Sequence, residues 1–141
     1  MRRSLSWLML MTDIGFLIYW AATFLKWIPK SYVYQDYNNP LLVAWNLSFL
    51  PLDLFISVTG LMSVALWRKR RPAWKPLALI SMVLTFCSGL QAIAFWSFRV
   101  DFDLVWWVPN LFLMLYPCVF IPGLVRSDQA VEKPTKERGA A

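Results

Sequence analysis

Two aspartates inside long apolar stretches are the residues of this sequence best able to perform chemistry. Asp13 lies eight residues into the first apolar stretch, and Asp53 lies near the middle of the second. A carboxylate is costly in a hydrocarbon environment, so such residues commonly mark ligand or proton sites. No lysine, arginine or histidine is predicted at either depth. Each aspartate must therefore be protonated, hydrogen-bonded or open to a water-filled cavity.

Polar side chains that could surround these carboxylates recur at helical spacing. Asn46, Asp53 and Gly60 are seven residues apart, which places them on one face of a helix. We predict a polar-centred pocket inside the membrane that takes a hydrophobic or cationic amphiphilic ligand from the outer leaflet. The predicted ligand-binding residues are Asp53, Asp13, Asn46, Gln91, Asn110 and Tyr116. The alternative interpretation is helix packing, because small and polar residues let transmembrane helices approach closely.

The residue types that other chemistries need are scarce. The chain has no histidine, which removes the commonest general base and metal ligand. It has no glycine-rich phosphate loop, no nucleophile elbow and no metal-ligand cluster, so no cofactor or metal is expected. An enzyme is conceivable only as a lipid-modifying isomerase or cyclase that uses the two aspartates.

Four apolar stretches must position these residues. Of the 141 residues, 59% are hydrophobic and only 16% are charged. About 20 mostly apolar residues suffice for a helix to cross the hydrocarbon core, and the backbone there must satisfy its own hydrogen bonds. The sequence predicts an all-α, four-helix membrane domain over residues 1–126, with helices at about 5–25, 41–67, 73–96 and 104–125. Residues 127–141 are predicted to form a disordered cytoplasmic tail.

The basic residues predict the orientation of this bundle. Eleven of the fourteen lysines and arginines lie before the first helix, around the second connection or after the fourth helix. The positive-inside rule therefore places both termini in the cytoplasm, in preference to an inverted or dual topology. The net charge of +6 does not indicate nucleic-acid binding, because no soluble domain is left to form a groove. The tryptophans form two interfacial belts, and only Trp20 lies deeper.

Four longer segments of the chain carry a family resemblance. They are TDIGFLIYW (12–20), DYNNPLLVAWNLSFLPLDLFISVTGL (36–61), LTFCSGLQAIAFW (84–96) and DFDLVWWVPNLFLMLYP (101–117). These segments resemble the YvaD-like family of small bacterial membrane proteins. The resemblance covers nearly the whole chain apart from the tail, and it implies a four-helix bacterial membrane protein without implying an activity.

Shorter motifs are similar to the emopamil-binding and sigma-2 receptor superfamily, which also has four helices. Asn39, Pro40 and Leu41 precede a helix that carries Asp53, and Pro109 opens the fourth helix in a similar setting. This resemblance implies a pocket for a hydrophobic or amphiphilic ligand. The histidine and glutamates of that superfamily's sterol isomerases have no counterpart here.

Two other functions are compatible with the same sequence. A small proton-coupled exporter would use Asp13 as its coupling residue, as small multidrug transporters use one carboxylate in their first helix. A non-catalytic subunit of a larger membrane complex would instead bury apolar helix faces against a partner chain. The oligomeric state is left open.

Overall fold

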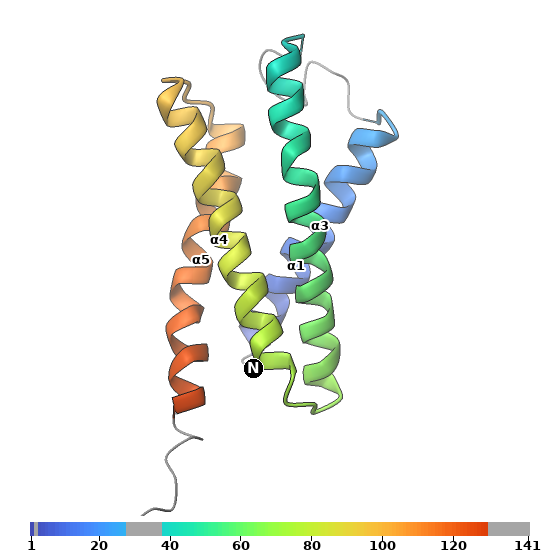
Figure 1. The fold of residues 1–141 in the computed structure, drawn as a ribbon, viewed down its shortest axis with the longest axis vertical. Helices are drawn as coiled ribbons and strands as arrows, with labels where there is room; N and C mark the ends of the chain where they lie inside the picture. Colours follow the sequence, from blue (N-terminus) through green and yellow to red (C-terminus); the bar gives the residue numbers. More distant parts are fainter. Residues whose placement is uncertain (2, 28–37, 130–141) are drawn as a thin grey trace, which may run out of the picture.

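A computed structural model describes residue 1 and residues 3–27 and 38–129 of the chain (Figure 1). This part consists of α1 (Arg3–Phe24), α3 (Pro40–Arg68), α4 (Trp74–Phe98) and α5 (Leu104–Gln129). The shortest, α1, has 22 residues, which at 1.5 Å per residue is about 33 Å and exceeds the hydrocarbon core of about 30 Å. All four helices are long and apolar enough to span a membrane, which confirms the predicted fold class.

The helix ends lie close to the predicted positions, with one notable difference. The last helix continues to Gln129, so residues 127–129, which we had assigned to a disordered tail, extend α5 instead. The rest of that tail, and residues 28–37 of the predicted first outer loop, lie outside the described residues.

Local capping explains where two of the helices begin. The Asn39 side chain accepts a hydrogen bond from the Leu41 amide (3.0 Å), and Pro40 occupies the first helical position. Asp103 caps α5 in the same way, accepting from the Val105 amide at 2.9 Å. These caps satisfy amides that have no partner within the helix.

The helices pack in chain order and diverge toward one end. Extensive contacts join α1 to α3, α3 to α4 and α4 to α5. An apolar cluster drawn from all four helices lies around Leu5 and Met9 near the start of α1, Met82 of α4 and Leu124 near the end of α5. Toward the upper end, α1 and α5 lean apart. The bundle is therefore closed below and splayed above.

Basic residues concentrate at the lower end of the bundle, opposite the end at which α1 and α5 lean apart. The start of α1, the connection between α3 and α4 and the last turns of α5 lie at the lower end (Figure 1). The last residue of α3 and the connection after it carry Arg68, Lys69, Arg70 and Arg71, whereas the described residues at the upper end include Lys26 and Arg99. The structure thus gathers the basic residues at one end, and the side of the membrane that this end faces remains a prediction.

Candidate functional site

The Asp53 carboxyl group lies at the centre of the splayed half. The side chain is buried and lies on α3, facing both neighbouring helices. The Trp20 indole Nε1 of α1 donates to its Oδ2 at 3.0 Å, and the Ser88 hydroxyl of α4 donates to its Oδ1 at 3.2 Å. These hydrogen bonds hold the carboxyl group in place. They also leave it room for another partner, since an ionised carboxylate has about four acceptor positions.

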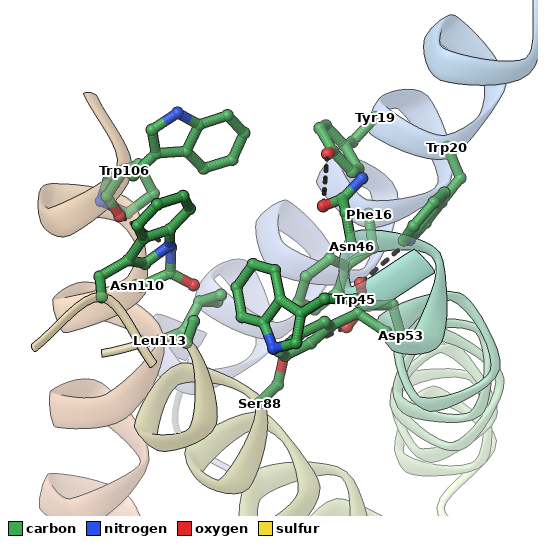
Figure 2. A pocket seen from close by; sticks show the side chains of 14 residues that line it. Phe16, Tyr19, Trp20, Trp45, Asn46, Asp53, Ser88, Trp106, Asn110 and Leu113 are labelled. Carbon is green, nitrogen blue, oxygen red and sulfur yellow. Dashed lines mark hydrogen bonds between the residues drawn. The ribbon is translucent and has the colours of Figure 1, made fainter. Parts of the chain in front are cut away.

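Above Asp53 the four helices enclose a cavity of about 230 Å³ (Figure 2). One side chain pair, Tyr19 and Asn46, is joined by a hydrogen bond of 3.2 Å from the tyrosine hydroxyl to the amide oxygen. Trp106, Asn110 and Leu113 of α5 face this pair from the opposite side. The full lining is Phe16, Tyr19, Trp20, Trp45, Asn46, Phe49, Asp53, Ser88, Ala92, Trp96, Trp106, Pro109, Asn110 and Leu113.

Stacked aromatic rings form the wall between α3 and α4. Trp45 and Phe95 stack with their ring centroids 3.8 Å apart, and Trp96 meets Trp45 edge-on at 5.6 Å. Such rings present a negative π face to a cation. The Arg99 guanidinium carbon already lies 5.8 Å from the Trp96 ring centroid, so this wall accepts positive charge.

Asp13 lies in a separate polar layer below the cavity. Its side chain is only 1% exposed and packs directly against Gly60 of α3, where a side chain would overlap the carboxyl group. Ser57 bridges the two helices, donating to the backbone oxygens of Asp13 (3.1 Å) and Asp53 (2.8 Å). Within the described residues, three buried atoms of this layer have no hydrogen-bond partner: Thr12 Oγ1, Asp13 Oδ2 and the Tyr116 hydroxyl.

The structure thus divides the six predicted ligand-binding residues into three groups. Asp53, Asn46 and Asn110 line the cavity together. Asp13 and Tyr116 are buried but do not line it. Gln91 is exposed, because the buried stripe of α4 continues through Ala92 and Trp96 instead.

The hydrogen bond from Trp20 to Asp53 was not anticipated, although the sequence held a signal for it. Trp20 alone among nine tryptophans falls outside the interfacial belts, and a buried indole N–H usually finds an acceptor. An intramembrane carboxylate at matching depth is such an acceptor. For metals, the described part of the chain contains no group of three or more histidine, cysteine, aspartate or glutamate side chains that could hold an ion.

Four membrane-length helices around a largely aromatic cavity with one buried carboxyl group define a small multi-pass membrane protein. Residues 5–131 match the family model described as "Family of unknown function (DUF5360)", and the chain belongs to this family. It is 50% identical over 124 residues to "Uncharacterized protein YvaD" of Bacillus subtilis (strain 168), covering 88% of this chain and 93% of that protein. No solved structure matches the chain. The similarity to the emopamil-binding superfamily stays a prediction from short motifs.

Proposed function

We propose that the protein binds a cationic amphiphile, with the cationic head on Asp53 and under the aromatic wall. The observation that carries this proposal is the position of Asp53 at the floor of a cavity whose other walls are largely aromatic. None of the fourteen lining residues, all of which belong to the described part of the chain, is a lysine or arginine. A buried carboxylate without a charged partner at the site favours a ligand that supplies the missing positive charge.

The neighbours of Asp53 suit such a ligand. Trp20 and Ser88 are neutral donors, so they orient the carboxylate without cancelling its charge. Trp45 and Trp96 bring aromatic rings to the cavity lining, and such rings attract a quaternary or protonated amine. Asn46 and Asn110 add amide groups on two sides of the cavity, which favour a polar head over a purely apolar molecule.

The test is equilibrium binding of dodecyltrimethylammonium to the purified protein in lipid nanodiscs. We expect Asp53→Asn, which keeps the shape and removes the charge, to weaken binding by about 30-fold or more, equivalent to the roughly 2 kcal/mol lost when a buried charge pair is broken. Dodecanol, a neutral amphiphile of equal chain length, should not distinguish the two proteins. Unchanged affinity for dodecyltrimethylammonium would refute the proposal.

Asp103→Asn is the matched control for this substitution. It makes the same chemical change at the N-cap of α5, and Asp103 is not among the residues that line the cavity. Asparagine caps helices as well as aspartate does, so folding should be preserved. Binding by this variant should equal that of the unmodified protein.

A second candidate, proton-coupled export, is favoured by one observation. The Asp13 carboxyl group is buried at mid-helix with one oxygen lacking a partner among the described residues, as a proton-carrying site requires. If this function holds, adding dodecyltrimethylammonium to sealed vesicles will move protons across the membrane, and Asp13→Asn will abolish that movement. A simple binder moves none.

A further inference from the structure

We infer that the ligand enters from the membrane between α1 and α5, and that its alkyl chain lies in this opening while its head occupies the cavity. This inference rests on the proposed function. We call the opening the α1–α5 seam and define it by Phe16 of α1 and by Pro109 and Leu113 of α5. All three residues line the cavity, and they come from the first and last helices of the bundle.

The contacts described above close two of the other three sides at the level of the cavity. Hydrogen bonds from Tyr19 to Asn46 and from Trp20 to Asp53 join α1 to α3. The Trp45–Phe95 stack joins α3 to α4. None of these contacts joins α1 to α5, and the extensive helix contacts likewise follow chain order.

The fourth side, between α4 and α5, is closed by backbone rather than by side chains. A Cβ atom at Gly89 would come within 2.6 Å of the Asn110 carbonyl oxygen and the Met114 amide nitrogen. The two helices therefore touch where no side chain intervenes. An alkyl chain cannot leave the cavity on this side.

The seam is confined to the upper half of the bundle. Below the cavity, Leu5 and Met9 of α1 share one apolar cluster with Tyr116 and Leu124 of α5. Near the upper end, Trp106 of α5 packs with Leu42 of α3 and Phe95 of α4, in a cluster that has no member from α1. The top of α5 is thus held to α3 and α4, and α1 stands apart from it, as Figure 2 shows.

For an amphiphile with a long alkyl chain, the size of the cavity requires an opening of this kind. Sites that enclose a drug-sized ligand hold about 300–1,000 Å³, and this cavity holds about 230 Å³. It has room for a head group and the first methylenes, but a long chain must extend beyond it. Leu17 and Phe112, the sequence neighbours of the seam residues Phe16 and Leu113, are exposed on the surface of the bundle. A single-chain amphiphile drawn from the leaflet fits this arrangement, whereas a short water-soluble cation does not use the seam.

The experiment uses two photoreactive forms of dodecyltrimethylammonium on the unmodified protein in nanodiscs. One form carries a diazirine beside the ammonium group, and the other carries it at the chain end. Labelled residues are mapped by mass spectrometry, with and without excess unlabelled decyltrimethylammonium. Only labelling that the competitor removes is counted. Tetramethylammonium serves as a second competitor that has the head group and no chain.

We expect the head-group probe to label cavity residues such as Trp45 and Trp96, and the chain-end probe to label α1 and α5 near Phe16 and Leu113. Tetramethylammonium should compete poorly. Chain-end labelling on α3 and α4, or at the connection between α4 and α5, would overturn the seam while leaving the proposed function intact. If decyltrimethylammonium removes no cavity labelling, the proposed function itself fails and the seam fails with it.

Discussion

A single glycine determines how the Asp13 carboxyl group is accommodated. The Asp13 side chain fills the space that a side chain at Gly60 would need. We expect Gly60→Ala to destabilise the protein by about 1–3 kcal/mol, because overpacking a well-packed site forces side chains or backbone to shift. Reversible unfolding in mixed detergent micelles measures the effect.

Gly15→Ala is the control for that substitution. A Cβ at Gly15 meets nothing within 4 Å, and alanine is the better helix former by about 0.5–1 kcal/mol. This variant should be as stable as the unmodified protein or slightly more so. Equal stability of the Gly60→Ala and Gly15→Ala proteins would show that Asp13 does not occupy the space at Gly60.

For single residues, the sequence predicts how deep a side chain lies along its helix better than which way it points around that helix. Asp53 and Asn46 were expected to share a helix face, and both line the cavity. Gln91 follows Ser88 by three residues, but a step of three turns it about 60° from Ser88, and Ala92 takes the buried position. A short polar stripe does not decide whether Gln91 or Ala92 is buried, because the buried face depends on where the neighbouring helix lies.

Among the helices, the pair α4 and α5 is the most tightly constrained. At Gly89 the obstacle to a larger residue is the backbone of α5, which cannot rotate away as a side chain can. We expect Gly89→Ala to force the two helices apart and to reduce stability by at least the roughly 1–3 kcal/mol typical of overpacking. Gly123→Ala on α5 is the control, since a Cβ there meets nothing within 4 Å. Similar unfolding of both variants would contradict this close approach.

The ends of the helices were predictable because local chemistry sets them. Asn39 and Pro40 start α3 through a side-chain cap and a fixed backbone angle. Both residue types can be recognised in the sequence as signals of a helix start. The end of α5 was placed too early because Arg126 and the polar residues after it suggested an interface. A helix can continue past the end of its apolar stretch, and α5 does so through Gln129.

For the molecule as a whole, the clustered charge predicts a fixed orientation. Translocating the four consecutive basic residues 68–71 is unfavourable, so the end that carries them should face the cytoplasm. The test uses single-cysteine variants Arg70→Cys and Val100→Cys in a background with Cys87 and Cys118 replaced by serine. We expect an impermeant maleimide to label the Val100→Cys protein in intact protoplasts and the Arg70→Cys protein only after lysis. The reverse pattern would invert the proposed topology.

The fold of the whole molecule was predictable for a physical reason that does not extend to the cavity. Lipid requires long apolar helices, and these are visible in composition alone. The cavity depends on how far α1 and α5 diverge, which follows from close approaches at Gly60 and Gly89 and from the rings of Trp45 and Phe95. The spacing of residues within one helix does not reveal which residues of a neighbouring helix they contact.

The fit between Asp13 and Gly60 also bears on the order in which the chain assembles during synthesis. The first helix leaves the ribosome with Asp13 at its centre, where an aspartate costs about 2.5–3.5 kcal/mol on insertion scales. At that stage nothing shields the carboxyl group from lipid. In the folded protein the carboxyl group packs against Gly60, which lies in the second half of α3. We therefore expect α1 to reach its final position only after Gly60 has been translated, and α1 and α3 to insert into the membrane as a cooperative pair.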